Sequence, residues 1–456
     1  MDHFDVFVIG GGGTASEIVG RLATPGGPRV GMAERDRLGG ECNWYGCVPS
    51  KIMLRAAKIA ALARGGGRFG LRIPSVDVDF DGVRDRVRTI VEESTSAGAR
   101  PFEEKGARVI LDEVRLVGAH ELETASGERL TADRVVLATG SEAAIPPIEG
   151  LREGPLWTNK EAIWHEGGVP ESLLVIGAGP IGVEFAQIYA RFGSHVTVVE
   201  SDANVLPPED EASGRTLREA LEADGVEILT NATITRATHS GTGWSVEVEG
   251  RSPIAAGEVL VATGRDPVLG DHDLERAGVA LDDRRRPVLG ETLRTTNPDV
   301  WAAGDATGEL LFTHVGTYEA GVVLDDLRGR PRPKDYRVVP RVTYTDPEVA
   351  SVGVTERAAR ESGTEVVSAT VLLRDNERAA IEGTPEGHVK LVADARSGEL
   401  LGGHVMGETA GELIHEIVAA MAGRIPATVV GGAIHAYPTF SESVQAAFAG
   451  LAEALP

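Results

Sequence analysis

The sequence predicts an α/β protein of several domains, and three observations support this prediction. The chain has 456 residues, which is too long for a single hydrophobic core, so about two to four domains are expected. Hydrophobic residues make up 42% of the chain and charged residues 25%, so the composition is that of an ordinary globular protein. In two places a short apolar run leads through a glycine-rich turn into a helical pattern, which is the building unit of a parallel sheet covered by helices.

The first of these units starts at residue 5. Residues 5–9 are typical of a buried parallel strand, and residues 16–22 have a helical pattern. The turn between them has the form G-x-G-x-x-A, with small residues at its three fixed positions, Gly10, Gly12 and Ala15. Such a turn lets the backbone approach a pyrophosphate and lets the helix pack against the strand. A second strand, over 30–33, ends at Glu34, which is placed to bind a ribose hydroxyl, so this unit predicts a Rossmann-like dinucleotide-binding site.

The same pattern returns in the middle of the chain. Strands are predicted over 173–176 and 195–199, with a helix over 183–192 between them. The intervening turn carries its three glycines at Gly177, Gly179 and Gly182, and the second strand ends at Glu200. One working site and one decayed copy would be an alternative, but both copies keep all their parts. Two dinucleotides are therefore predicted, and electron transfer between two nucleotides usually involves a flavin and a nicotinamide.

The chain contains only two cysteines, Cys42 and Cys47, five positions apart. A structural disulfide usually closes a longer loop, because a short loop removes little entropy from the unfolded chain. In a reducing compartment a close pair indicates either metal binding or catalysis. A metal site would need further cysteine or histidine ligands at matching spacing, and none lies nearby in the sequence. We therefore expect redox catalysis and no metal.

Net charge and hydropathy restrict the partners. The formal net charge of −24 argues against nucleic acids and anionic membranes, because both would be repelled. Salt adaptation or solubility would explain the charge equally well. No apolar run approaches the ~18 residues of a membrane span, and the N-terminus lacks the basic and apolar regions of a signal peptide. A cytoplasmic enzyme acting on a small molecule is expected.

Residues 39–51 read G-G-E-C-N-W-Y-G-C-V-P-S-K. This segment resembles the signature of the class I pyridine nucleotide-disulfide oxidoreductases, which include dihydrolipoamide dehydrogenase, glutathione reductase and mercuric reductase. The likeness extends along the chain, through A-T-G segments at 138–140 and 262–264, a second flavin motif at 296–305 and the opening of a dimerisation domain at 345–353. It implies an FAD domain over 1–150 and 275–340, an NAD(P)H domain over 151–274 and a C-terminal α+β dimerisation domain over 341–456 that forms a homodimer.

The resemblance also implies roles for particular residues. Cys42 would be the interchange thiol that attacks substrate, and Cys47 would form the thiolate that lies against the flavin. Lys51 would lie near the flavin and pair with Glu184, although a surface ion pair of little energetic value is the alternative. Residues five apart in a regular helix cannot form a relaxed disulfide, so the backbone between the cysteines must be distorted. Further cofactor contacts are implied at Gly40, Thr139, Gly140, Gly264, Gly304, Asp305 and His314.

Two positions depart from the family pattern. Glu41 stands where many relatives carry threonine beside the flavin pyrophosphate, so its carboxyl group must be protonated or turned away. Relatives that handle dithiols carry H-P-x-x-x-E, whose histidine is offered by the neighbouring subunit and moves the proton of the interchange thiol. Here Tyr437 replaces that histidine, while Pro438 and Glu442 keep their places. Tyrosine is a poor proton acceptor at neutral pH because its pKa is near 10. His435 is either an alternative base or a structural histidine.

The sequence leaves the electron acceptor open. The first interpretation is a reductase of a small disulfide or related sulfur compound, the second a quinone or metal-ion reductase, and the third a non-catalytic redox sensor that binds FAD. Mercuric reductase proper is not expected, because residues 446–456 contain no cysteine. Glu200 would repel the 2′-phosphate of NADPH, so NADH is the expected reductant, with NADPH possible.

Overall fold

The computed structural model describes residues 1–270 and 272–455. This part of the chain divides into two compact units. The first contains residues 1–52, 82–144 and 264–335, and the second contains residues 53–81, 145–263 and those from Tyr336 onward. None of the helices in the described ranges is long and apolar enough to cross a membrane. The predicted α/β fold class is confirmed, whereas the domain limits predicted above stay a prediction.

The first unit is built on a seven-stranded sheet. Its parallel part has the order β3-β2-β1-β6, with β16 also paired to β6, and β5 and β4 continue the sheet as an antiparallel hairpin. The strands are β1 (Asp2–Ile9), β2 (Val30–Ala33), β3 (Arg108–Ile110), β4 (Val114–Leu116), β5 (Glu121–Thr124), β6 (Arg129–Leu137) and β16 (Val300–Ala302), with a separate ribbon of β7 (Ser141–Ala143) and β15 (Arg265–Pro267). The helices are α1 (Gly13–Leu22), α2 (Gly40–Trp44), α5 (Arg100–Glu103) and α9 (Thr313–Leu327), and α3 (Cys47–Arg64) and α4 (Phe80–Thr95) extend from this unit into the second.

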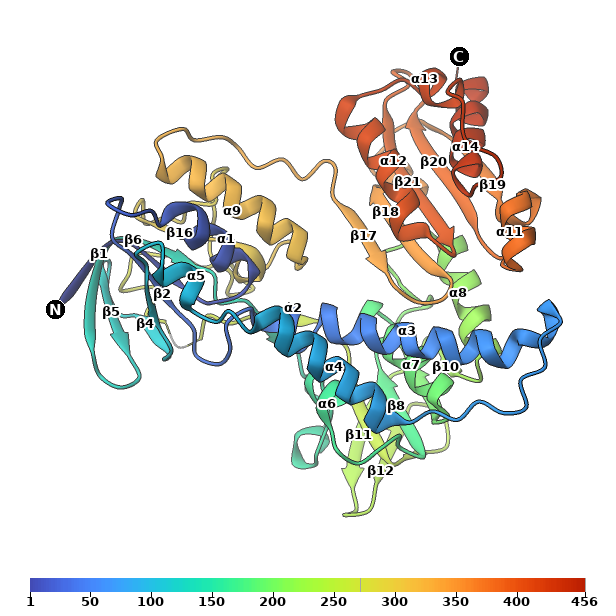
Figure 1. Cartoon of the computed structure of the whole chain (residues 1–456), viewed down its shortest axis with the longest axis horizontal. Helices are drawn as coiled ribbons and strands as arrows, with labels where there is room; N and C mark the ends of the chain where they lie inside the picture. The colour runs from blue at the N-terminus through green and yellow to red at the C-terminus, as the bar shows by residue number, and fades with distance from the viewer. Residues whose placement is uncertain (271, 456) are drawn as a thin grey trace. The chain divides into compact units, whose positions relative to one another are not determined.

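Successive side chains of β1 point to opposite faces of the sheet, and each face is covered by different elements. Val6 and Val8 are buried in one hydrophobic cluster with residues of α1 and α9, which lie against each other in Figure 1. Phe7 and Ile9 point to the opposite face and pack with the β4–β5 hairpin. Helix α1 begins at Gly13, three residues before the predicted start, because the first turn of a helix needs no preceding hydrogen-bond partners and tolerates glycine.

The second unit contains a parallel sheet of order β10-β9-β8-β14 and an antiparallel sheet β11-β12-β13. Their strands are β8 (Ser172–Ile176), β9 (His195–Val199), β10 (Glu227–Leu229), β11 (Ile234–His239), β12 (Trp244–Val248), β13 (Ile254–Ala256) and β14 (Glu258–Val261), accompanied by α6 (Asn159–Trp164), α7 (Pro180–Phe192) and α8 (Glu211–Ala223). Helix α7 also begins three residues before its predicted start, with Pro180 in its first turn, where the missing N–H costs nothing.

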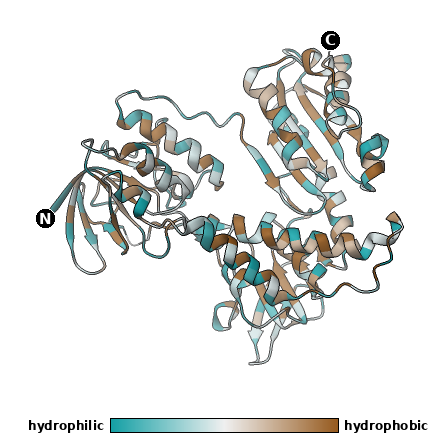
Figure 2. Cartoon of the chain, viewed as in Figure 1, coloured by the Kyte–Doolittle hydropathy of each residue, from teal (hydrophilic) through white to brown (hydrophobic). Residues whose placement is uncertain are grey.

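The rest of the second unit is a five-stranded antiparallel sheet of order β17-β18-β21-β20-β19. Its elements are β17 (Pro340–Thr343), β18 (Glu348–Gly353), α10 (Glu356–Glu361), β19 (Val366–Leu372), α11 (Glu377–Glu382), β20 (His388–Asp394), β21 (Leu400–Gly407), α12 (Ala410–Gly423), α13 (Ala427–Gly431) and α14 (Ser441–Ala454). Helices α12 and α14 share one hydrophobic cluster with the strands. Figure 2 shows hydrophobic residues along these strands, while hydrophobic and hydrophilic residues mix on the covering helices.

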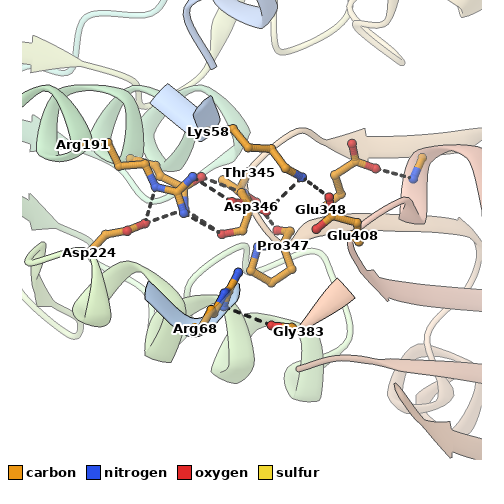
Figure 3. A network of polar contacts seen from close by, with 12 residues as sticks. Lys58, Arg68, Arg191, Asp224, Thr345, Asp346, Pro347, Glu348, Gly383 and Glu408 are labelled. Atoms are coloured by element: carbon orange, nitrogen blue, oxygen red, sulfur yellow. Dashed lines mark hydrogen bonds and ion pairs between the residues drawn. The ribbon is translucent and has the colours of Figure 1, made fainter. Parts of the chain in front are cut away.

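A polar network joins three segments of the second unit (Figure 3). Asp346, in the turn between β17 and β18, forms ion pairs with Arg191 of α7 at 2.8 Å and with Lys58 of α3 at 3.1 Å. Arg191 also pairs with Asp224 at 2.9 Å, and Lys58 with Glu408 at 2.8 Å. Burial raises the pKa of Asp346, but the two cations outweigh it and the net pKa is lowered. Because the cations and anions alternate, each partly buried charge has an opposite neighbour.

Candidate active site

The first glycine-rich turn leaves the start of α1 open on one side. Gly10 has φ +118°, and a Cβ there would lie 2.1 Å from the carbonyl oxygen of Ala138, so only glycine fits. At Gly12 a Cβ would meet its nearest heavy atom only at 3.9 Å, which leaves room for a ligand. The Glu34 carboxylate accepts hydrogen bonds from the backbone N–H groups of Gly11 and Asp36, both at 2.8 Å, so it is fixed at the end of β2.

Two further segments reach this turn from distant parts of the sequence. The Gly39 amide donates to the Gly11 carbonyl at 2.9 Å, and a Cβ on Gly40 would lie only 2.7 Å from the Cα of Gly12. A Cβ on Gly304 would lie 2.6 Å from the hydroxyl of Thr14, in the first turn of α1. Small residues therefore let two loops converge on the exposed amides of α1, which suits an anionic group such as a pyrophosphate.

The remaining residues predicted for this cofactor have different environments. Thr139 has a buried hydroxyl with no hydrogen-bond partner among the described residues, a feature that a bound group would satisfy. Asp305 accepts a 2.5 Å hydrogen bond from the Ser141 hydroxyl. Ala15 is fully buried under the sheet, and Gly140 has φ +76°. His314 is exposed in the first turn of α9 and stacks on Phe312, with the ring centroids 5.3 Å apart.

The second glycine-rich turn has the same construction. Gly177 has φ +103°. A Cβ on Gly182 would lie 2.0 Å from the carbonyl oxygen of Gly177. A Cβ on Gly179 would meet nothing within 4 Å. Glu200 is buried and accepts from the backbone amides of Ala178 at 2.6 Å and Asp202 at 2.8 Å. In the first unit Gly264 has φ +130° and open space around the position of a Cβ.

The two cysteines lie on consecutive helices. Cys42 is in α2, which ends at Trp44, and Cys47 is the first residue of α3. The break falls at Tyr45 and Gly46, where a Cβ on Gly46 would lie 3.2 Å from the Glu41 carbonyl oxygen. The expected distortion is therefore present, and it brings the two thiols within hydrogen-bonding reach of each other.

The two thiols have opposite acidities. A hydrogen bond from Cys42 lowers the pKa of Cys47 to about 6, although burial opposes this shift, and Thr313 and the charge of Lys51 lower it further. The Thr313 hydroxyl lies 3.6 Å from the Cys47 sulfur. The hydrogen bond to Cys47, together with burial, raises the pKa of Cys42. These two shifts favour the proton on Cys42 and the negative charge on Cys47 in the reduced pair.

Lys51 and Glu184 lie in different units, and their predicted pairing stays a prediction. Lys51 donates to the Ser50 hydroxyl at 3.3 Å, in the first turns of α3. Glu184 is buried on α7 and accepts from the backbone N–H of Tyr344 at 2.9 Å.

The C-terminal turn before α14 holds the remaining predicted residues. Tyr437 is 71% exposed, and its peptide bond to Pro438 is cis. Glu442 accepts from the backbone N–H of Thr439 at 2.9 Å. His435 contacts the Glu416 carboxylate through Nε2 at 2.8 Å and the Ala433 carbonyl through Nδ1 at 3.2 Å. Burial lowers the pKa of His435, but its hydrogen bonds to Glu416 and Ala433 outweigh this and the net pKa is raised.

Comparison with known proteins assigns the family. Residues 4–320 match the model of the pyridine nucleotide-disulphide oxidoreductases, and residues 339–448 match the dimerisation domain of the same family. The chain belongs to this family. It is an FAD-dependent oxidoreductase that takes electrons from NAD(P)H and acts on disulfide sulfur, and its dimerisation domain indicates a homodimer. The resemblance inferred from the sequence is confirmed.

The relatives span the whole chain. The mercuric reductase of Acidithiobacillus ferrooxidans is 34% identical over 451 residues, which cover 97% of this chain and 81% of the relative. The dihydrolipoyl dehydrogenase of Chlorobaculum tepidum is 34% identical over 459 residues, covering 98% of this chain and 97% of the relative. Among solved structures, the Cu(II) complex of the HOCl-induced flavoprotein disulfide reductase RclA from Escherichia coli is 27% identical, has a TM-score of 0.89 and covers 98% of this chain and 99% of its own.

The geometry of this pyridine nucleotide-disulphide oxidoreductase fits FAD. The open turn at Gly12, the fixed carboxylate of Glu34, the unpartnered hydroxyl of Thr139 and the side chain of Asp305 would hold the cofactor. When bound, FAD accepts the hydride of NAD(P)H and passes electrons to the cysteine pair. Among the described residues no group of three or more histidine, cysteine or acidic side chains could hold a metal ion.

Three contributing residues were not identified from the sequence. Thr313 contacts a cysteine from a distant helix, and no local pattern distinguishes this threonine from others. Arg265 directly follows the A-T-G segment at 262–264, and no local pattern indicates its contact with Glu41. Glu416 partners His435 from α12, and its acidic side chain on a helix gave no signal of that contact.

Substitution of Thr313 tests the acidity of Cys47. In Thr313→Val the hydroxyl that stabilises the thiolate is lost, so the pKa of Cys47 should rise. A hydrogen bond worth about 1 kcal/mol corresponds to a rise of somewhat less than one pH unit. The measurement is the pH dependence of anaerobic alkylation of the reduced protein, with the modified cysteine identified by peptide mass. Thr317→Val, one turn further along α9, is the matched control and should leave the midpoint unchanged. An unchanged midpoint in Thr313→Val would contradict the assignment.

Proposed function

We propose that this oxidoreductase passes electrons from NADH through FAD and the Cys42–Cys47 pair to a small sulfur acceptor, and that deprotonation of Cys42 limits the rate. The observations behind this proposal are that the hydrogen bond to Cys47 and burial raise the pKa of Cys42, and that both ring nitrogens of His435 already face oxygen atoms. The cysteine pair would act in a cleft shared with Tyr437 of the partner subunit, in the reducing environment of the cytoplasm.

The His435 contacts argue against this residue as the base. Both of its ring nitrogens face oxygen acceptors, the Glu416 carboxylate and the Ala433 carbonyl. Only the protonated imidazole can donate to both, so His435 is expected to be a cation with no free lone pair. Tyr437 is accessible, but a phenol side chain lacks the basic ring nitrogen that the histidine of the family pattern offers.

The chemistry on the cysteines then follows. The Cys42 thiol loses its proton to solvent, and its thiolate attacks one sulfur of the acceptor disulfide to form a mixed disulfide. One acceptor thiolate leaves. The Cys47 thiolate, stabilised at the start of α3, attacks Cys42 and releases the second thiolate, which re-forms the Cys42–Cys47 disulfide. Two electrons pass to the acceptor. Glu184 would pair with Lys51 and so hold the positively charged ammonium group of Lys51 beside the cysteines.

Direct reduction of a quinone or metal ion is a second candidate function. Electron delivery to a quinone from the flavin needs no proton transfer from Cys42, so it would not suffer from the missing base. The relatives named as mercuric reductases and the Cu(II) complex of RclA are consistent with a metal-ion acceptor. A non-catalytic sensor is the least supported alternative, because both cysteines are present and Cys47 lies at the start of a helix, where the thiolate is favoured.

The nicotinamide preference is a separate prediction. Glu200 is buried and fixed by two backbone amides, so a 2′-phosphate would meet a carboxylate that cannot turn away. We expect the specificity constant for NADH to exceed that for NADPH by about tenfold or more, since a charge–charge conflict of this kind costs more than ~1.4 kcal/mol. Glu200→Gln should lower the ratio of the NADH specificity constant to the NADPH specificity constant. Glu227→Gln, on the edge strand β10, should leave this ratio unchanged. Steady-state kinetics that favour NADPH would overturn the assignment.

Tyr437 provides the test of the proposed function. The wild-type enzyme should reduce glutathione disulfide or lipoamide slowly at neutral pH and quinones comparatively fast. Tyr437→His should raise disulfide turnover by about 100-fold or more, the usual contribution of a general base, and leave quinone turnover within about twofold. Tyr437→Phe is the matched control and should leave disulfide turnover unchanged. Wild-type disulfide turnover of tens per second, or no gain in Tyr437→His, would refute the proposal.

A further inference from the structure

Two acidic side chains lie close to the open start of α1. Glu41 follows Gly40, whose Cα packs against the Gly12 turn. Asp305 follows Gly304, which packs against Thr14 in the first turn of the same helix. The two carboxylates are near enough for Glu41 to raise the pKa of Asp305, together with the larger effect of burial. Both carboxylates therefore belong to loops that pack against the turn that fits the FAD pyrophosphate.

One arginine is held between these two carboxylates. Arg265, in the β7–β15 ribbon, forms an ion pair with Glu41 at 3.1 Å. Its Nε donates to the Ser141 hydroxyl at 2.8 Å, and Nη2 donates to the Ser141 carbonyl at 2.7 Å. The Ser141 hydroxyl in turn donates to Asp305 at 2.5 Å. The side chain of Arg265 is only 13% exposed, so its charge acts in a partly desolvated site.

We propose that Arg265 is a cofactor-retention residue, which offsets the charges of Glu41 and Asp305 and so allows the FAD pyrophosphate to bind beside them. The sequence suggested that Glu41 must be protonated or turned away, and the ion pair with Arg265 is a third solution. This proposal rests on the family's use of FAD and not on the electron acceptor.

Simple electrostatics explains why the cation is needed. A pyrophosphate carries negative charge, and in a partly buried site its repulsion by a carboxylate is weakly screened. A fixed guanidinium that contacts Glu41 and acts on Asp305 through Ser141 lowers this repulsion. A threonine at position 41 would add no charge and would reduce the need for Arg265. The energetic contributions of Arg265 and Glu41 should therefore be coupled.

A double-mutant cycle measures this coupling. The dissociation constant of FAD is determined for the full-length apoprotein by flavin fluorescence quenching, for wild type, Arg265→Ala, Glu41→Thr and the double variant. Arg265→Ala should weaken FAD binding by about tenfold or more, because it removes a cation paired with Glu41 near the pyrophosphate. Glu41→Thr should bind FAD at least as tightly as wild type. The double variant should recover most of the loss seen in Arg265→Ala.

Controls separate this effect from misfolding and from catalysis. Arg129→Ala removes an arginine of the same unit whose partner, Glu123, lies on the neighbouring surface strand, and it should bind FAD like wild type. Far-UV circular dichroism confirms folding, and Arg265→Lys, which keeps the charge, should lose less affinity than Arg265→Ala. Wild-type affinity in Arg265→Ala, or an equal loss in the double variant, would overturn the proposal. These outcomes do not depend on the acceptor, so they are distinguishable from failure of the proposed function.

Discussion

The position of one proton between Cys42 and Cys47 governs what this active site can do. The chain breaks its helix at Tyr45 and Gly46, so that one sulfur lies in α2 and the other at the start of α3. Exposed amides at the start of a helix stabilise an anion, and Thr313 adds a hydrogen bond from α9. These contacts favour the negative charge on Cys47 and the proton on Cys42. Electron transfer to a disulfide then depends on where that proton goes.

The second constraint is that buried or clustered carboxylates need hydrogen-bond donors or cations nearby, in a chain with a net charge of −24. Glu34 and Glu200 end equivalent strands, and each is fixed by two backbone amides. Asp346 lies between two cations, and Glu41 is paired with Arg265. The carboxylates at the nucleotide sites and inside the second unit are thus each stabilised by backbone amides or by a cation. The same rule explains His435, whose cationic form is stabilised by Glu416.

The sequence was sufficient for the elements that obey local rules. Strands predicted over 30–33 and 195–199 have the observed limits of β2 and β9, because apolar runs between polar residues define them well. The glycine-rich turns could also be identified, because steric restrictions require small residues at fixed positions of such turns. The starts of α1 and α7 were placed three residues late, because glycine and proline weaken a helical pattern without preventing a first turn.

Contacts between distant segments could not be obtained in this way. The partner of Glu41 is Arg265, and the hydroxyl beside Cys47 belongs to Thr313. Such pairs leave no periodic signal in a single sequence, and the folded sheets alone bring them together. For the same reason the two acceptors around the His435 ring were invisible until α12 and the turn before α14 were placed.

The central claim, that Cys42 keeps its proton and has no base in the enzyme, is tested most directly by stopped-flow kinetics. Enzyme reduced with NADH is mixed with glutathione disulfide, and the loss of the long-wavelength absorbance of the thiolate beside the flavin is followed as a function of pH. The account predicts a rate that rises by about tenfold per pH unit between about pH 6 and 9, because the reactive Cys42 thiolate forms only by proton loss to solvent. A rate that is already constant near neutral pH would show that a base within the enzyme takes the proton, and would contradict the account.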